Sequence, residues 1–147
     1  MASLIVHGGA GDSAVIDDEP LFRAGCAKAA RVGHQVLKRG GSALDAVIEA
    51  VVVMEDDPVF NAGTGAALTS RGEAETDASV MRGEDGGAGA VACLLDVKNP
   101  VRVARLVMER TPHVLLVGPG AREFAAAQGV PLLAPLGLVS DSARAKW

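Results

Sequence analysis

The residue types that most often carry catalysis are few in this chain and stand far apart. The three histidines, His7, His34 and His113, do not cluster, and the H-E-x-x-H spacing that binds zinc on a helix does not occur. A G-x-S-x-G nucleophile turn is also absent, so an α/β-hydrolase triad has no anchor. The sequence therefore gives no support to a zinc hydrolase or an α/β-hydrolase.

The two cysteines, Cys26 and Cys93, are too few for a disulfide framework or a zinc motif. Cys26 falls in a predicted helix and Cys93 in the apolar run Ala-Val-Ala-Cys-Leu-Leu. We expect both to be packed, reduced thiols, with a nucleophilic role as the minor alternative.

Two glycine-rich loops are the places where a site could be built. Gly8-Gly9-Ala10-Gly11 follows an apolar segment, and Asn61-Ala62-Gly63-Thr64-Gly65 follows a predicted helix. The first loop lacks the third glycine of a dinucleotide fingerprint, and no helix starts directly after it. Taken from the residues alone, a site at these loops has no evident nucleophile, base or metal.

Helical periodicity predicts the elements that flank these loops. A first helix starts at Pro20 and ends before Gly40-Gly41. A second starts at Ser42, which forms an S-x-x-D capping box with Asp45, and ends at Pro58. The predicted buried stripe of this second helix comprises Leu44, Val47, Ile48, Val51 and Val52, with Asp45, Glu49 and Asp56 opposite.

The pattern then changes from a helical period to a period of two. It predicts strands at 67–69, 73–80 and 89–95, joined by turns at Arg71-Gly72 and 83–87. The strand at 89–95 is apolar on both faces, so we expect both to be covered. A strand at 3–7, a helix from Asn99-Pro100 to 111, a strand at 113–117, a helix at 119–128 and a helical, polar tail after Val139 complete the series. This order favours a single α+β layered sandwich over residues 1–147.

Composition excludes several classes of function. The chain of 147 residues is 49% hydrophobic, only 3% aromatic and carries a net charge of −4. Interspersed charges of this balance do not attract nucleic acid or an anionic membrane surface, and the apolar runs are too short to span a bilayer. The first residues lack the features of a signal peptide, so we expect a cytoplasmic protein. The high apolar content also indicates surface meant for a protein partner.

Several motifs in order resemble the plant-type asparaginase family of threonine-type Ntn hydrolases, in register from about Leu4 to about Gly129. The similar stretches are His7-Gly8-Gly9-Ala10-Gly11, residues 41–47, 55–58, 60–66, 77–81, 87–92, 99–100, 104–109 and 112–114, with Gly118, Gly120-Ala121 and Phe124-Ala125. Each motif alone is weak, whereas the ordered set is specific.

The resemblance implies a four-layer αββα sandwich of which this chain is the N-terminal half. In that family one precursor cuts itself into α and β chains, and a threonine becomes the new N-terminus of the β chain. Its hydroxyl attacks the side-chain amide of L-asparagine or the isopeptide bond of a β-aspartyl dipeptide, with its own α-amine as the general base. Thr64, Thr69, Thr76 and Thr111 lie inside this chain and have no free α-amine.

The resemblance also assigns roles to residues of this chain. Asn61 is implied to help position the nucleophile, although Asn before Ala-Gly is equally typical of a plain turn. Gly8, Gly9 and Gly11 are expected to pack beside the new N-terminus, with a plain tight turn as the alternative. A structural Na⁺ is implied on backbone carbonyls, although a helix-ending loop with bound water fits the sequence too. Its ligands are Met54, Glu55, Asp57, Phe60, Ala62 and Thr64.

The implied partners are the β subunit from the same precursor, a second αβ unit and the small-molecule substrate, with no organic cofactor. Residues 139–147 are expected to begin the linker between the subunits. A glycosylasparaginase-type amidase, a taspase-like protease and a non-catalytic interaction subunit remain as alternatives. The sequence does not rank asparagine against β-aspartyl dipeptides, because the residues expected to discriminate them lie on the β chain.

Overall fold

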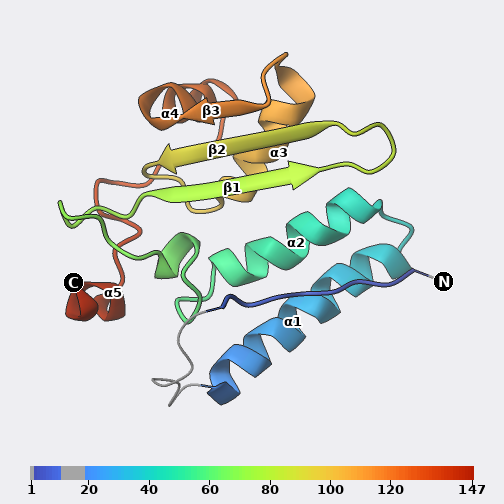
Figure 1. The fold of residues 1–147 in the computed structure, drawn as a ribbon, viewed down its shortest axis with the longest axis horizontal. Helices are drawn as coiled ribbons and strands as arrows, with labels where there is room; N and C mark the ends of the chain where they lie inside the picture. The colour runs from blue at the N-terminus through green and yellow to red at the C-terminus, as the bar shows by residue number, and fades with distance from the viewer. Residues whose placement is uncertain (1, 11–18) are drawn as a thin grey trace.

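The computed structural model describes residues 2–10 and 19–147 and shows a mixed α/β fold (Figure 1). Its elements, in chain order, are α1 (Glu19–Lys38), α2 (Ala43–Glu55), the 3-10 turn η2 (Gly63–Gly65), β1 (Thr76–Met81), β2 (Ala88–Leu94), α3 (Pro100–Arg110), β3 (Leu115–Val117), α4 (Gly118–Ala127) and α5 (Asp141–Lys146). The sheet has the order β1-β2-β3, with β1 antiparallel and β3 parallel to β2. Each predicted α-helix is confirmed.

The alternation predicted for residues 73–80 is confirmed in β1 and the residues before it. Ala74, Thr76 and Val80 are buried, while Asp77 and Ser79 on the other face are exposed. The turn at Arg71-Gly72 also forms, with Gly72 at a positive φ of 75°. The predicted strand at 67–69 is reduced to an isolated bridge between Leu68 and Ala74.

β2 is buried on one face only, which differs from the two-sided cover that the sequence predicts. Gly89 and Val91 lie against the core, whereas the opposite face of β2 is half-buried. The strand register places six apolar residues on this open face. They are Met81, Ala88, Ala90, Ala92, Leu115 and Val117. Figure 1 shows α3 behind the sheet and no helix in front of it.

The main core lies between the buried face of the sheet and the helices α2, α3 and α4. Its buried members are Leu44, Ile48, Val80, Val91, Leu94, Val97, Val101, Val103, Ala104, Val107, Ala121 and Ala125. Small and β-branched side chains dominate this set, as the low aromatic content predicts. Such a core depends on close approach of its elements, because its fully buried members include no aromatic ring.

α2 forms with its predicted cap but with a different buried face. The Ser42 side chain accepts from Asp45 N–H, and the Asp45 carboxylate accepts from Ser42 N–H, which completes the capping box. Val47 and Val51 are partly exposed, at 39% and 36% of their surface, although the stripe pattern predicts them buried. Ala46 and Ala50 are buried instead, because they pack against Gly33 of α1.

The N-terminal segment at 3–7 is extended but pairs with no strand among the described residues, so the predicted strand is not assigned. Leu4 packs against Gly33 of α1, and residues 4–7 line a groove with Val47 and Val51 of α2. Ile5 points outward and is 93% exposed. The segment thus lies along the α1–α2 pair and leaves its backbone edge unpaired.

The tail after Val139 is helical, as predicted. Ser140 caps α5 through its hydroxyl, which accepts from Ala143 N–H at 3.1 Å. Its function as the start of a linker stays a prediction. Within the described residues, no helix is long and apolar enough to cross a membrane.

We predict that Gly89→Ala destabilises the fold, because the added methyl group would lie 2.2 Å from the Ala104 carbonyl oxygen and 2.5 Å from Met108 N on α3. Such overpacking costs about 1–3 kcal/mol in a tight core. Gly120→Ala is the control, since a methyl group there meets nothing within 4 Å, and because Gly120 lies in α4 the change should leave stability the same or raise it by up to about 1 kcal/mol. Urea unfolding of both variants measures this, and equal stabilities would contradict the close β2–α3 contact.

Candidate functional site

The loop from Asp56 to Ala66 carries Asn61, the main candidate in this chain. Backbone hydrogen bonds fold the loop on itself, from Phe60 N–H to the Asp57 carbonyl at 3.1 Å and from Ala62 N–H to the Phe60 carbonyl at 2.8 Å. Asn61 is exposed, and its side-chain oxygen Oδ1 accepts from Ala67 N–H at 2.7 Å. The carboxamide is therefore held by its oxygen, and its NH₂ group lies at the surface of the loop.

Phe60 anchors this loop in the protein and is only 2% exposed. Its ring lies against Gly25 of α1 on one side and Gly8 of the N-terminal loop on another. Phe22 of α1 makes an edge-to-face contact with it, with ring centroids 5.7 Å apart. The ring thus joins three segments that are distant in the sequence.

The glycine loop at His7–Ala10 lies beside this ring. Gly9 has a positive φ of 115°, and its N–H donates to Nδ1 of His7 at 3.1 Å. A side chain at Gly8 would come within 2.7 Å of Cys26 Sγ, so glycine is required there by the contact. Gly8 and Gly9 are therefore close to the loop that carries Asn61, while Gly11 lies outside the described residues.

Two glycines allow the Asp56–Ala66 loop to close around its own carbonyl groups. A Cβ at Gly63 would lie 2.3 Å from the Glu55 carbonyl oxygen, and Gly63 has a positive φ of 49°. A Cβ at Gly65 would lie 2.1 Å from the Phe60 carbonyl oxygen. The backbone therefore passes directly over two of the carbonyls predicted to bind a cation.

The carboxyl group of Glu55 is the one strongly perturbed acid in the described core. Glu55 is 2% exposed, and its Oε1 accepts from Val101 N–H at the start of α3 at 3.0 Å. Oε2 has no hydrogen-bond partner. Burial raises the pKa of Glu55 to about 7, although the hydrogen bond from Val101 N–H opposes the shift.

Charged residues around Glu55 tie α2 to the start of α3. Asp56 pairs with Lys98 at 2.9 Å and accepts from Asn99 Nδ2 at 3.0 Å. Partial burial alone would raise the pKa of Asp56, but these bonds outweigh it and hold that pKa below its ordinary value. The base of the loop is thus fixed on both its buried and its exposed side.

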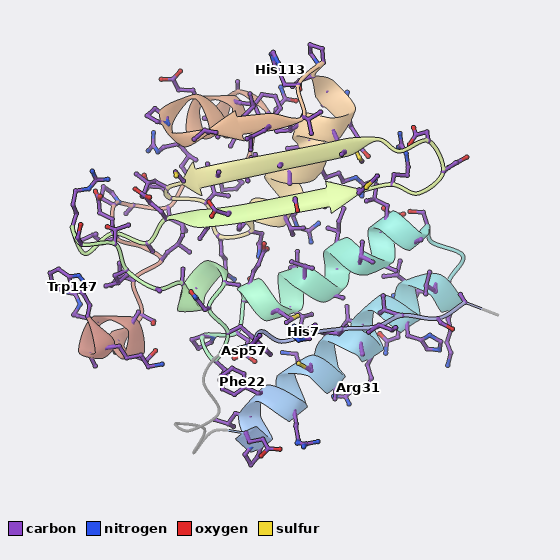
Figure 2. The ribbon with its side chains drawn as sticks, viewed as in Figure 1. His7, Phe22, Arg31, Asp57, His113 and Trp147 are labelled. Atoms are coloured by element: carbon purple, nitrogen blue, oxygen red, sulfur yellow. The ribbon has the colours of Figure 1, made fainter. Side chains whose placement is uncertain are left out.

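Other candidates from the sequence do not converge. His7 and His113 lie in different parts of the molecule (Figure 2), and the described residues contain no group of three or more His, Cys, Asp or Glu side chains that could hold a metal ion. Both cysteines are free, as predicted, but Cys93 is exposed rather than packed. Asp77 has a structural role, because its carboxylate accepts from Cys93 N–H at 2.7 Å beside an irregularity in the β1–β2 ladder.

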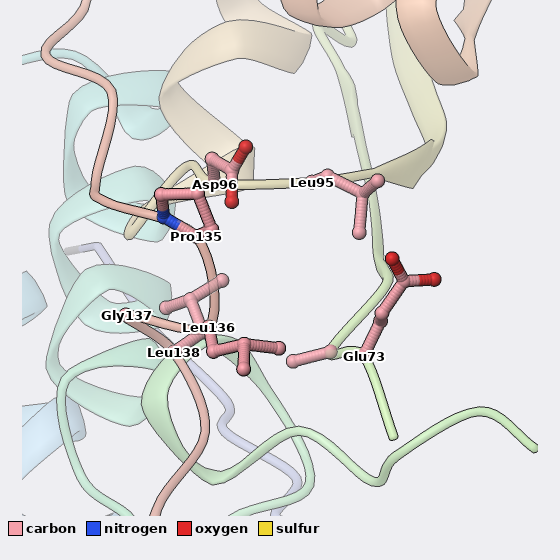
Figure 3. Close-up of a pocket in the computed structure, with 8 residues that line it drawn as sticks. Glu73, Leu95, Asp96, Pro135, Leu136, Gly137 and Leu138 are labelled. Atoms are coloured by element: carbon pink, nitrogen blue, oxygen red, sulfur yellow. The ribbon is translucent and has the colours of Figure 1, made fainter. Parts of the chain in front are cut away.

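A shallow pocket lies between Glu73, Asp96 and the 135–138 turn, away from these loops (Figure 3). Its lining is mixed, with the apolar side chains of Leu95, Leu136 and Leu138 beside the two acids. The Asp96 carboxylate is engaged by Arg122 of α4 at 2.9 Å. The pocket brings together none of the residues that the sequence marks for chemistry.

Sequence reasoning missed two contributors to the site. It chose Glu55 only for its backbone carbonyl, although Glu55 stands seven residues after Ile48 and so on the buried side of α2. It also passed over Gly25, which stands three residues after Phe22 and four before the buried Ala29. Helical spacing could have identified both positions as buried.

Comparison with known proteins gives a consistent result. The family model described as asparaginase matches residues 1–147. The isoaspartyl peptidase/L-asparaginase of Homo sapiens is 49% identical over 138 residues, which is 94% of this chain and 45% of that protein. The Bos taurus protein of the same name is 48% identical over 141 residues, 96% of this chain and 46% of its own length.

An archaeal relative matches to the same degree. The plant-type L-asparaginase of Pyrococcus furiosus is 50% identical over 147 residues, which is 100% of this chain and 47% of that protein. The chain therefore spans about half the length of the curated relatives that it matches.

We predict that Glu55→Gln stabilises the protein above neutral pH. The folded pKa of about 7 lies above the ordinary 4.5, so the stability that this group contributes is present below pH 4.5 and lost as pH rises through 7. The neutral amide keeps the acceptor for Val101 N–H and removes the buried charge. It should raise the unfolding free energy at pH 8 by about 1–3 kcal/mol and flatten its pH dependence.

Urea unfolding between pH 5 and pH 8 measures this effect. Glu49→Gln on the same helix is the matched control, because Glu49 is partly exposed and pairs with Arg102 at 3.0 Å. It should change the unfolding free energy by less than about 1 kcal/mol at any pH. A Glu55→Gln protein less stable than wild type at pH 8 would show that Glu55 is stabilising as a charge.

Proposed function

This chain belongs to the asparaginase family, and we propose that it is the α subunit of an amidohydrolase that converts L-asparagine to aspartate and ammonia and hydrolyses β-aspartyl dipeptides. The observation that carries the proposal is the match of the family model to all 147 residues. Relatives whose names state isoaspartyl peptidase and L-asparaginase activity support it, at 48% and 49% identity.

The complete enzyme in this proposal contains a β subunit that arises from the same precursor by self-cleavage. It would complete a four-layer αββα sandwich by placing a second sheet on the open face of the first. Three apolar side chains on that face, Met81, Leu115 and Val117, are 70%, 51% and 51% exposed, which supports a protein partner there. The unpaired edge of residues 3–7 offers further backbone donors and acceptors.

The nucleophile in this proposal is the N-terminal threonine of the β subunit. Its hydroxyl oxygen attacks the side-chain carbonyl carbon of the substrate, and its own α-amine accepts the proton. The C–N bond breaks, ammonia or an amino acid leaves with a proton, and water then releases aspartate from the ester. Backbone and side-chain donors stabilise the oxyanion. Most of these donors would lie on the β subunit.

Asn61 is the residue of this chain that we place beside the nucleophile. Its Oδ1 is held by Ala67 N–H at 2.7 Å, which orients the carboxamide and leaves the NH₂ group as a donor. A fixed donor of this kind can hold the threonine hydroxyl in line with the substrate carbonyl. Gly8 and Gly9 would line the same place with backbone only, which leaves room for the new N-terminus, and the role proposed for Gly11 concerns a residue outside the described ranges.

A Na⁺ ion fits the loop between α2 and Ala66 in the same proposal. Its ligands would be the carbonyl oxygens of Met54, Glu55, Asp57, Phe60, Ala62 and Thr64. Gly63 and Gly65 let the backbone pass close to the Glu55 and Phe60 carbonyls, which supports a tight loop that gathers these carbonyl groups. Four of the six carbonyls, those of Met54, Asp57, Phe60 and Ala62, already accept backbone N–H groups, and each keeps a second lone pair. The ion would hold the loop and take no part in the reaction.

We further propose two αβ units in the assembled enzyme, residues 139–147 as the start of the linker cut from the precursor, no organic cofactor, and a cytoplasmic location. The two unpaired cysteines are in keeping with a reducing compartment.

Co-expression of this chain in one precursor with the C-terminal half that its relatives have tests the function directly. We expect self-cleavage before a threonine, release of ammonia from L-asparagine, and release of free amino acids from β-aspartyl dipeptides. Replacement of that threonine by alanine is the control. A correctly folded complex that hydrolyses neither substrate would support a non-catalytic subunit instead.

We predict that Asn61→Ala lowers self-cleavage or kcat at least tenfold while the fold survives, because the donor to the nucleophile is lost. Asn61→Asp is the informative companion, since it keeps an acceptor for Ala67 N–H but has no NH₂ group. If only the hydrogen bond from Ala67 N–H to the side-chain oxygen matters, Asn61→Asp retains activity. Steady-state kinetics and the fraction cleaved distinguish the cases, and near-normal kinetics for both variants would refute a role in positioning.

A further inference from the structure

We infer that Phe60 is a positioning residue, whose ring, held between Gly8 and Gly25, fixes the Asn61 loop and the glycine loop relative to each other. The inference rests on the proposed function, since it assigns a cause to the geometry of the same site. Phe60 itself would touch neither the nucleophile nor the substrate.

The contacts of the ring are too close for any residue but glycine at two positions. A Cβ at Gly25 would lie 2.6 Å from Cε2 and 2.7 Å from Cζ of Phe60. A Cβ at Gly8 would lie 2.9 Å from Cε1 of the same ring. Real Cβ atoms do not approach this closely, so the ring is seated directly on the backbone of α1 and of the N-terminal loop.

Without the ring, glycine would be unfavourable at position 25 and would not be needed for the backbone conformation at position 8. Gly25 stands inside α1, where glycine costs about 1 kcal/mol relative to alanine. Gly8 has no positive φ that would demand glycine by itself, unlike Gly9. The ring explains the glycine at position 25, and at position 8 it acts together with Cys26 Sγ, which a Cβ would approach to 2.7 Å. Helix propensity and turn geometry explain neither glycine.

The seat is connected to the candidate site by short covalent paths. Asn61 follows Phe60 directly, so the position of the ring sets where the Asn61 backbone leaves the core. On the other side, Gly8 is bonded to Gly9, whose N–H is held by His7 Nδ1. A shift of the ring therefore moves both loops, and small misplacements near a reacting centre cost large factors in rate.

Two variants of the complete enzyme test the inference. Phe60→Leu removes the ring but keeps an apolar side chain, and Gly25→Ala pushes the ring out while improving the helix. Each should lower kcat about tenfold or more per cleaved enzyme and change KM less than about twofold. In the double variant the smaller leucine makes room for Ala at position 25, so its kcat should equal that of Phe60→Leu alone.

Amide hydrogen exchange gives a readout that does not depend on activity. The Ala67 amide donates to Asn61 Oδ1, so its exchange should accelerate at least tenfold in both variants. Phe124→Leu is the matched control, because Phe124 is a partly buried ring packed against the main core. It should lower Tm while kcat and Ala67 exchange stay at wild-type values.

The outcomes separate the two proposals. A wild-type enzyme that hydrolyses neither substrate defeats the proposed function, and Ala67 exchange then still decides whether Phe60 positions Asn61. An active wild type with unchanged kcat and unchanged Ala67 exchange in Gly25→Ala overturns the inference alone. If Phe60→Leu does not fold, Gly25→Ala carries both measurements, because it adds one methyl group to a helix.

Discussion

The buried carboxyl group of Glu55 is the interaction on which the placement of the candidate site depends. It joins the last residue of α2 to the first turn of α3, through Val101 N–H. The amide groups at a helix N-terminus favour a negative charge, whereas burial disfavours it, and the pKa of about 7 shows that burial dominates. The loop with Asn61 leaves directly from this junction. Its position is therefore tied to α3, and through α3 to the sheet.

A row of ion pairs at the surface runs beside this junction and favours one register of α2 against α3. The acids of α2 and of its C-cap meet the bases at and before α3 in antiparallel order, in the pairs Asp45–Arg105, Glu49–Arg102 and Asp56–Lys98. Hydrogen bonds from Ser42 and then Arg105 hold the pKa of Asp45 below its ordinary value. Exposed pairs of this kind contribute little stability one by one. Their order specifies which register of α2 on α3 is formed, and so where Glu55 comes to lie.

Local sequence rules predicted the positions of the helices and strands well, and they predicted less well which face of each is buried. The Ser42–Asp45 capping box and the alternation through β1 are short-range features, so the sequence contains all that is needed to place them. In α2 nearly every position from Leu44 to Met54 is apolar, so periodicity alone does not choose a face. The face of α2 with Ala46 and Ala50 is buried against Gly33 of α1, because small residues let two helices approach closely. The segment at 3–7 was predicted as a strand from its apolar pattern. A strand also requires a pairing partner, which a local pattern does not supply.

The sequence predicted which loops form the candidate site, but not how these loops contact each other in space. The glycine pattern located both loops, and the resemblance to a family assigned Asn61 its expected role. Neither composition nor spacing revealed what brings the two loops together. The connection is made by contacts among residues 8, 25 and 60, and a glycine inside a helix looks like a defect until the ring beside it is placed. Residues that violate local preference, such as Gly25 in a helix and Glu55 in a core, thus mark where the fold gives up stability to hold its loops. The proposed role, which is to position a nucleophile carried by another subunit, would require this, because the contribution of such a chain to the reaction would be geometry.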